Sequence, residues 1–336
     1  MKSTTYLKFK LLLILAAVAL LAVPGMLVVN MISMPGRSYS GDFSDLTGHE
    51  IEVESQLKEH VEKLGGKIGI RNNPITLQMS LNYITDRLKS YGYVVKEQKY
   101  NVDTMQLRNI EAEKRGTQKP DEIIILGAHY DSIYSSPGAD DNGSGVASVL
   151  EMARLFSERE CKRTIRFVFF ASEEPPYFRS HSMGSYHYAT RCKQRNENLN
   201  AVLIFESLGY YTDDPNSQRY PLAYLPAYPE KGNFIGFVSN LNSQRLLKKC
   251  VSAFRSSTDF PSQGISAPEW LTGIDWSDQM YFWKCNFQSV MITDTALYRN
   301  PYYHTGADTP EKLNYPCFAR VVGGLETVVA ALANYD

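Results

Sequence analysis

The chain has 336 residues, of which 43% are hydrophobic, and its 35 Lys and Arg residues nearly balance its 36 Asp and Glu residues. This length and composition predict one large α/β domain. The formal net charge of −1 shows no basic excess and therefore argues against a nucleic-acid partner.

An uncharged apolar run over residues 11–29 follows Lys2, Lys8 and Lys10. About 19 residues at 1.5 Å each nearly span a bilayer core of roughly 30 Å, so we expect a membrane anchor with the rest of the chain exported. Pro24 and Gly25 interrupt the run, and a secretory signal peptide with an apolar core over residues 11–23 is the alternative. We therefore divide the chain into an anchor or signal segment (1–32), a linker (33–48) and one domain (49–336). The domain is expected on the periplasmic or extracellular side, and as a secreted protein if the segment is cleaved.

The five cysteines are scattered without a C-x-x-C spacing. This pattern fits neither a zinc ribbon nor a dense disulfide framework, although an exported domain can contain one or two bridges.

The first half of the domain predicts helices followed by a sheet edge. Apolar residues recur at helical spacing over residues 52–64 and 76–91, the second segment being preceded by Pro74 and followed by Gly92. Residues 94–102 and 108–114 alternate between apolar and polar, which predicts an antiparallel edge pair.

Residues 123–128 are apolar and rich in β-branched side chains, which predicts a strand buried on both faces. The strand ends at His129, and Asp131 lies on the same side of an extended chain, where it can orient the imidazole. Asp140, Asp141 and Asn142 then lead through a glycine-rich turn into a helix that runs to about residue 158. Alone, these features also fit a hydrogen-bonded histidine and a helix-capping turn.

Three further apolar strands lead to polar side chains. Residues 165–171 lead to Glu173 and Glu174, residues 201–205 end at Glu206, and residues 289–293 precede a loop that contains His304. Ligands in α/β sheets bind at the carboxyl ends of the strands, so these side chains are expected to form one site.

Two imidazoles and three carboxylates suit two metal ions that share a bridging carboxylate; the set is His129, Asp141, Glu174, Glu206 and His304. Imidazole ligands favour zinc over magnesium or calcium. Glu173 is then free to act as the general base.

In combination, these motifs resemble the zinc aminopeptidases of metallopeptidase family 28 over about residues 50–335. The resemblance is carried by His129-Tyr-Asp131, residues 138–145, Glu173-Glu174, Glu206, Ser277-Asp278 and Tyr303-His304. It implies a peptide substrate and a mixed, mostly parallel sheet of about eight strands with helices on both faces. It also implies that Asp141 bridges two zinc ions, one held by His129 and Glu206 and the other by Glu174 and His304.

The same resemblance implies that Glu173 is the base and that Asp131 orients His129. Glu206 departs from the aspartate that the family commonly has there. Members of the family frequently have a Ser-Asp-His motif, and this chain has Gln279 in place of the histidine, after Ser277 and Asp278. Any role of that histidine in shaping the substrate pocket is therefore in doubt here. We assign Asp278, Gln279 and Tyr303 to the substrate pocket.

A segment dense in Tyr and Pro over residues 210–234 predicts a long loop, either a wall of the substrate site or a packed surface loop. Four aromatic residues are expected in the core rather than in a pocket, namely Trp270, Trp276, Phe282 and Trp283.

Three functions follow from these observations. The first is a membrane-tethered or secreted di-zinc exopeptidase that acts at the amino terminus of peptides. The alternatives are a single-zinc acyltransferase that resembles the glutaminyl cyclases, and a non-catalytic ectodomain with a peptidase fold. The complete ligand set argues against the non-catalytic ectodomain, and Glu206 with the intact 141–145 turn favours two metals. The oligomeric state is not predicted.

Overall fold

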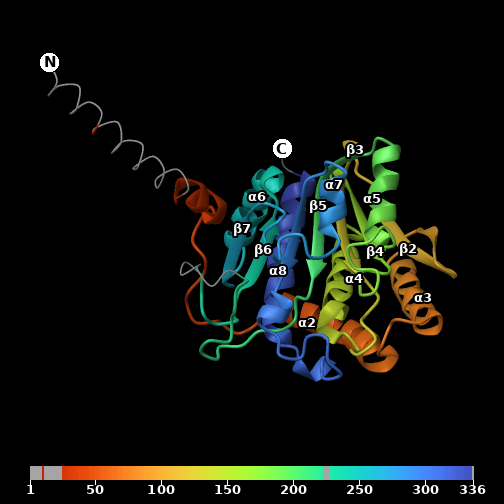
Figure 1. The fold of residues 1–336 in the computed structure, drawn as a ribbon, viewed down its shortest axis with the longest axis horizontal. Coiled ribbons are helices and arrows are strands. Elements are labelled where there is room, and N and C mark those ends of the chain that lie inside the picture. The colour runs from red at the N-terminus through yellow and green to blue at the C-terminus, as the bar shows by residue number, and fades with distance from the viewer. Residues whose placement is uncertain (1–9, 11–24, 222–227, 335–336) are drawn as a thin grey trace, which may run out of the picture.

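The structure is a computed structural model that describes residues 10, 25–221 and 228–334. Its centre is an eight-stranded sheet with the order β1-β2-β4-β3-β5-β8-β6-β7 (Figure 1). The strands are β1 (Val95–Val102), β2 (Met105–Lys114), β3 (Lys119–His129), β4 (Arg163–Phe170), β5 (Asn198–Glu206), β6 (Ile235–Ser239), β7 (Ser262–Ser266) and β8 (Ser289–Thr293). The α/β class and the mixed, mostly parallel eight-stranded sheet are thus confirmed.

The four middle strands, β4, β3, β5 and β8, run parallel to one another. All eight residues of β4 are buried, and β3 is buried from Ile123 to His129, as expected for strands that are covered on both faces. The β1–β2 pair lies antiparallel at one edge. At the other side β6 runs antiparallel to β8 and parallel to β7. The carboxyl ends of the four middle strands therefore meet at one edge of the sheet.

Helices cover both faces of the sheet, and each layer has its own hydrophobic cluster. One layer contains α2 (Gly48–Val61), α3 (Pro74–Ser90), α4 (Gly145–Phe156), α6 (Gln244–Arg255) and α8 (Tyr315–Asn334). The other contains α5 (Gly184–Gln194) and α7 (Gln279–Lys284). Helix α7 contacts β5 and β8, whereas β6 and β7 are contacted by α6 from the opposite face.

Capping residues determine where the first helices begin. Thr47 and Glu50 form a reciprocal capping box at the start of α2, which therefore begins four residues before the expected position. The Asn73 side chain accepts the N–H groups of Ile75 and Thr76 at the start of α3. Helix α2 continues into a π-helical turn over Glu62–Ile68.

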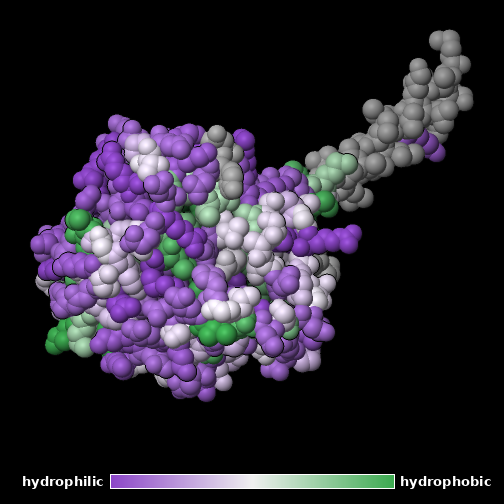
Figure 2. All heavy atoms as spheres, turned by 180° about the vertical axis from the view of Figure 1, so that it is seen from behind, coloured by the Kyte–Doolittle hydropathy of each residue, from purple (hydrophilic) through white to green (hydrophobic). Residues whose placement is uncertain are grey.

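The expected membrane segment lies mostly outside the described residues, so the anchor stays a prediction. Residues 25–32 are helical and display exposed Met26, Leu27 and Val29. Helix α8 is long and apolar enough to span a membrane, but most of it is buried inside the domain, as in a core helix. Figure 2 shows that the rear face of the domain is mainly hydrophilic, with hydrophobic residues in separate patches.

Residues 33–44, in the expected linker, lie along the domain. Arg255 donates to the carbonyl oxygens of Pro35 and Gly36, both at 3.1 Å, and the Ser262 N–H donates to Ser38 Oγ at 2.9 Å. The Phe43 ring stacks on Phe260 with centroids 5.5 Å apart. This segment is therefore part of the packed structure.

The five cysteines are free thiols, and three of them, Cys161, Cys192 and Cys250, are buried. The structure therefore contains none of the one or two bridges that an exported domain can have. Of the four aromatic residues expected in the core, Phe282 and Trp283 are buried in the α5–α7 layer. Trp270 is instead 81% exposed, and Trp276 lines a cavity, so the expectation is wrong for these two residues.

Candidate metal centre and active site

The five expected metal ligands meet at the carboxyl edge of the sheet. His129 is the last residue of β3 and Glu206 is the last residue of β5. Glu174 follows β4, Asp141 lies in the buried turn before α4, and His304 lies in the loop after β8. Parallel alignment of the strands explains why side chains so far apart in sequence converge.

The ligands form two groups that share Asp141. One oxygen of Asp141 lies 3.3 Å from His129 Nε2, which is also 3.3 Å from Glu206 Oε2. The other oxygen lies 3.1 Å from His304 Nε2, which is 3.3 Å from Glu174 Oε2. Each oxygen of Asp141 thus faces a different imidazole, which is the arrangement of a bridging carboxylate.

These distances fit zinc coordination better than hydrogen bonding. Ligand atoms about 2.0–2.1 Å from a tetrahedral zinc ion are separated by about 3.3–3.4 Å, close to the four spacings above. The Nε2 atoms of His129 and His304 and the Oδ1 atom of Asp141 are buried and make no hydrogen bond of acceptable geometry, although possible partners lie nearby. Unpaired buried polar atoms of this kind need an explanation, and a shared cation provides one. The residues present therefore fit zinc.

In the absence of metal, the carboxylates and imidazoles of the site shift one another's pKa values. Burial would raise the pKa of Asp141, but His129 and His304 outweigh burial and lower it. Burial would lower the pKa of His129, but Glu206, Asp131 and Asp141 hold it well above its ordinary value. Burial and the neighbouring Asp141 raise the pKa of Glu174 to about 7. Carboxylates crowded in this way favour a bound cation.

Asp131 has a larger part in the site than the sequence indicated. Its oxygens accept the backbone N–H groups of Glu173 and Glu174 at 3.2 and 3.1 Å. The Asp131 carboxylate also lies 3.5 Å from His129 Nδ1. It therefore fixes the strand end that carries the two glutamates and faces the imidazole that it was expected to orient.

Glu173 is buried and lines the cavity beside the two ligand groups, without belonging to either. Burial raises the pKa of Glu173 well above its ordinary value, and the carboxylates of Glu206, Glu174 and Asp278 add to this effect. These surroundings favour the protonated form of the carboxyl group. A general base passes through this form after it has accepted a proton from its substrate.

The turn that carries Asp141 is fixed by two residues that pattern analysis did not single out for this role. Both oxygens of Asp308 accept backbone N–H groups, from Asp140 at 2.9 Å and from Asp141 at 3.2 Å. The Asn142 side chain donates to Phe205 O at 2.8 Å and accepts the N–H of Ser207 at 3.0 Å. Asn142-Gly143-Ser144 matches the Asn-x-Ser/Thr sequence for N-glycosylation, but Asn142 is fully buried, so its glycosylation is incompatible with this fold.

Arg71 supports the same region from behind and is also absent from the sequence prediction. Its fully buried guanidinium donates to the carbonyl oxygens of Tyr130 at 2.8 Å, Pro137 at 2.5 Å and Gly138 at 2.9 Å. It thereby links the end of β3 to the turn that contains Asp141. Its sequence neighbourhood carries no motif, so only the folded chain reveals it.

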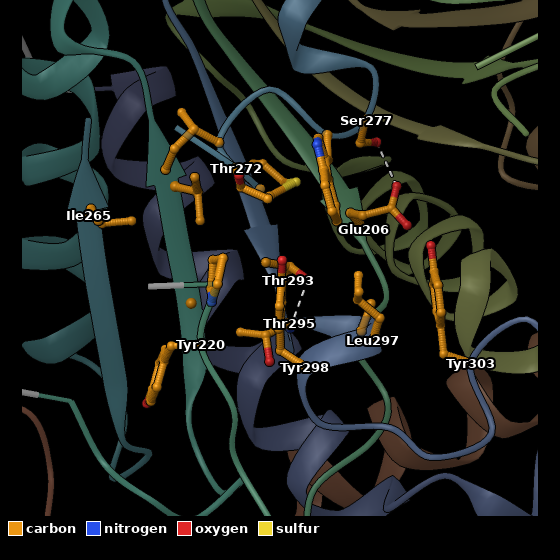
Figure 3. A pocket seen from close by; sticks show the side chains of 18 of the residues that line it. Glu206, Tyr220, Ile265, Thr272, Ser277, Thr293, Thr295, Leu297, Tyr298 and Tyr303 are labelled. Atoms are coloured by element: carbon orange, nitrogen blue, oxygen red, sulfur yellow. Dashed lines mark hydrogen bonds between the residues drawn. The ribbon is translucent and has the colours of Figure 1, made fainter. Parts of the chain in front are cut away.

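The expected pocket residues divide into two groups. Tyr303 lines the cavity and stacks on His304, with ring centroids 3.8 Å apart. Asp278 and Gln279 are fully buried and are not among the lining residues. Gln279 Nε2 instead donates to the carbonyl oxygens of Ile274 and Trp276, because α7 begins there and turns the side chain into the protein. Ser277, just before them, donates to Glu206 Oε2 at 2.6 Å, as Figure 3 shows.

A cavity of about 320 Å³ opens directly beside the metal ligands. It extends from Glu206 and Tyr303 to Ile265 on β7 (Figure 3). The described part of the 210–234 loop contributes Gln218, Arg219, Tyr220, Pro221, Tyr228 and Phe234 to its lining. Of the two alternatives for this loop, the structure therefore shows the wall of a cavity.

Comparisons with known proteins agree with this fold and site. A family model described as "Peptidase family M28" matches residues 109–328. The uncharacterized protein YfbL of Escherichia coli K12 is 36% identical over 285 residues, which cover 82% of this chain and 87% of YfbL. Aminopeptidase Y of Saccharomyces cerevisiae is 30% identical over 203 residues, covering 53% of this chain and 34% of that protein.

Two solved structures share the fold. The zinc aminopeptidase BSAP from Bacillus subtilis aligns with a TM-score of 0.66 at 15% identity, covering 87% of this chain and 97% of BSAP. A Porphyromonas gingivalis glutaminyl cyclase aligns with a TM-score of 0.61 at 20% identity, covering 83% of this chain and 97% of the cyclase. The family match covers more than half of the chain, which therefore belongs to peptidase family M28 and is a zinc-dependent metallopeptidase.

Proposed function

We propose that this protein is an aminopeptidase that uses two zinc ions and removes residues from the free amino terminus of peptides. The observation that carries the proposal is the shared carboxylate. Asp141 presents one oxygen to His129 and the other to His304, and each imidazole has a second carboxylate beside it.

One ion would be held by His129, Asp141 and Glu206, and the other by Asp141, Glu174 and His304. When bound, zinc supplies Lewis acidity, which polarises a carbonyl oxygen and lowers the pKa of water. The protein groups do the rest. Asp131 fixes the backbone of Glu173 and Glu174, and Asp308 fixes the backbone of Asp141, so the ligands are arranged before substrate arrives.

Glu173 is the residue that moves protons. It takes a proton from the attacking water as the new carbon–oxygen bond forms, and it gives that proton to the leaving amine as the carbon–nitrogen bond breaks. Its raised pKa makes the protonated intermediate state accessible. Glu174 is unsuitable for this role because it faces His304 as a ligand.

Charge favours the amino rather than the carboxyl end of the substrate. Besides the three ligand carboxylates, Glu173, Asp131 and Asp278 place further acidic groups at the site. Among the described residues that line the cavity, Arg219 is the only Lys or Arg, and its side chain lies on the exposed loop. The carboxylates that bound zinc does not neutralise would attract a substrate ammonium group, and among the described lining residues only Arg219 is a Lys or Arg that could pair with a terminal carboxylate.

The test uses the full chain purified with zinc. We expect release of the first residue from unblocked peptides, no release from N-acetylated peptides, and close to two zinc ions per chain. C-terminal amidation should not affect the rate. Cleavage of the acetylated peptides from the carboxyl end would refute the polarity. One zinc per chain together with cyclisation of N-terminal glutamine would favour the cyclase reaction instead.

We also propose that the catalytic domain is exported and held at a membrane by its amino-terminal segment. The support is the apolar run over residues 11–29 after three lysines. Fractionation of cells that produce the full chain should place it in the membrane fraction, with the domain accessible to protease from the exported side. Recovery in the soluble cytoplasmic fraction would contradict this proposal.

A further inference from the structure

The amino-terminal segment meets the domain at the beginning of α6. Asn30 is the first polar residue after the apolar run over residues 11–29. Its carbonyl oxygen accepts a hydrogen bond from the Gln244 side chain at 3.0 Å, and its side-chain oxygen accepts one from Lys248 Nζ at 3.4 Å. Figure 1 shows the helix over residues 25–32 beside α6 and β7. The boundary between the apolar run and the polar chain therefore lies at the first turns of α6.

The residues just before Asn30 have apolar side chains that the domain leaves uncovered. Met26, Leu27 and Val29 are 71%, 58% and 60% exposed. Met31, directly after Asn30, is instead partly buried and packs against the hydrophobic cluster of the α5–α7 layer. The domain therefore covers the chain from Met31 onward, and the exposed apolar residues before it suit the interior of a bilayer.

The outer face of α6 is basic. The inner face of this helix is apolar and buried, with Leu246, Leu247, Cys250, Val251 and Phe254. Arg245 and Lys249 are exposed and lie four residues apart on one face, with Lys248 beside them. The helix contains no Asp or Glu. In the part of the chain that the structure describes, none of these three cations forms an ion pair with a carboxylate. Their charges are therefore available to an external anion.

Two exposed apolar side chains lie next to this end of α6. Leu241, in the 3-10 turn Leu241–Ser243 that leads into the helix, is half-exposed, and Trp270 is largely exposed. The Asn240 side chain donates to Glu269 Oε1 at 2.8 Å, which holds the loop of Trp270 beside the turn. Tryptophan is enriched at membrane–water interfaces, where its ring lies among the lipid headgroups.

The basic residues are close enough to the end of the apolar run to reach lipid headgroups. Residues 244–249 span only about 7.5 Å along the helix axis, and two of them, Gln244 and Lys248, contact Asn30. The field of a charged surface extends over about 8 Å at physiological ionic strength. If the apolar run enters a bilayer, Arg245 and Lys249 therefore lie within the field of its headgroups.

We propose that the beginning of α6 is a membrane-contact surface, formed by Leu241, Arg245, Lys248, Lys249 and Trp270. The three cations bind the phosphate groups of anionic phospholipids, and the two apolar side chains enter the interface between headgroups and acyl chains. The inference rests on the proposed membrane anchoring and adds a second contact, between the catalytic domain and the lipid surface. It is independent of the reaction that the enzyme catalyses.

The test uses the full chain in vesicles of about one-third phosphatidylglycerol and two-thirds phosphatidylcholine, with bromine near the top of the phosphatidylcholine acyl chains. Bromine quenches tryptophan only at short range. The chain has three tryptophans, so quenching of Trp270 should remove up to about a third of the fluorescence. Trp270→Phe should abolish this quenching, which assigns the signal to Trp270. Vesicles of brominated phosphatidylcholine alone should quench at least twofold less.

A matched pair of double variants tests the basic residues. Each Lys or Arg near an anionic surface strengthens binding about fivefold, so Arg245→Gln with Lys249→Gln should weaken docking about 25-fold. Its quenching should fall to the level found with phosphatidylcholine alone. Lys89→Gln with Lys99→Gln removes the same charge from α3 and β1, at the opposite edge of the sheet, and should behave like the parent. All four residues are exposed, so urea unfolding should show the parent's stability in both variants.

Flotation of the vesicles distinguishes this inference from the anchor on which it rests. Protein that floats with the vesicles without quenching of Trp270 would overturn the inference. Quenching that responds neither to phosphatidylglycerol nor to the loss of Arg245 and Lys249 would overturn it as well. Protein that floats with neither kind of vesicle would instead refute the proposed membrane anchor.

Discussion

Glu173 and Glu174 are adjacent in sequence but have different positions in the site, which makes them a matched pair for mutation. Glu174 faces His304 at 3.3 Å and belongs to a ligand group, whereas Glu173 belongs to neither group. Replacing either residue by Gln keeps the size of the side chain and removes one carboxylate. The two variants therefore separate proton transfer from zinc binding at neighbouring residues.

Glu173→Gln should lose activity while it keeps its zinc. General acid–base catalysis contributes about 10²–10⁴-fold, so kcat should fall by that factor, equivalent to roughly 3–5 kcal/mol of activation free energy. The variant should also be more stable without zinc, because the carboxylate that burial and its neighbours disfavour is gone. Glu174→Gln should lose both zinc and activity.

Three measurements check this pair of variants: kcat on an unblocked peptide, zinc per chain by elemental analysis, and unfolding of the zinc-free proteins in urea. If Glu173→Gln retained activity within tenfold of the parent, another group would have to carry the proton. If it lost as much zinc as Glu174→Gln, the separation between base and ligand would be wrong.

Three further predictions concern the ligands and the fold. His304→Ala should leave about half of the parent's zinc, because only one ligand group contains this residue; unchanged zinc by elemental analysis would contradict the two groups. Ser277→Ala removes the hydroxyl that donates to Glu206 and should weaken zinc binding about 10–100-fold in chelator competition, as loss of a ligand's supporting hydrogen bond does. Burial, with Arg87 and Arg154, lowers the pKa of His60 from 6.5 to about 3, so the neutral imidazole's stabilisation is complete above pH 6.5 and is lost as pH falls toward 3. The free energy of unfolding should therefore fall by up to about 1.4 kcal/mol per pH unit in this range, and His60→Gln, measured in urea at pH 7 and pH 5, should show a smaller fall.

The ligand set was predictable from the sequence because each ligand lies close to a strong local pattern. Buried parallel strands are continuous apolar runs, and His129 and Glu206 are the polar residues at which two of these runs stop. The family resemblance then supplied the pairing of ligands. The beginning of β3 was not predictable in the same way, because residues 119–122 are polar or half-exposed and extend the strand without an apolar signal.

The supporting residues could not be predicted because their roles exist only in the folded chain. Arg71 lies far from the ligands in sequence and Asp308 follows His304 by four residues, but each acts through backbone groups that any sequence contains. Trp276 is similar, because its ring becomes a cavity wall only in the folded chain. A tryptophan side chain is usually buried, but only the packing of the folded chain decides whether its ring faces the core or a cavity.

The contacts of residues 30–44 have a mechanical consequence. Gln244 donates to Asn30 O at 3.0 Å, Arg255 and Ser262 bind the next residues, and Phe43 stacks on Phe260. Residues 30–44 are therefore packed against the domain beside α6 and β7, and they do not form a flexible linker. If a membrane holds the amino terminus, as proposed above, residues 30–44 would attach the domain to it along α6 and β7.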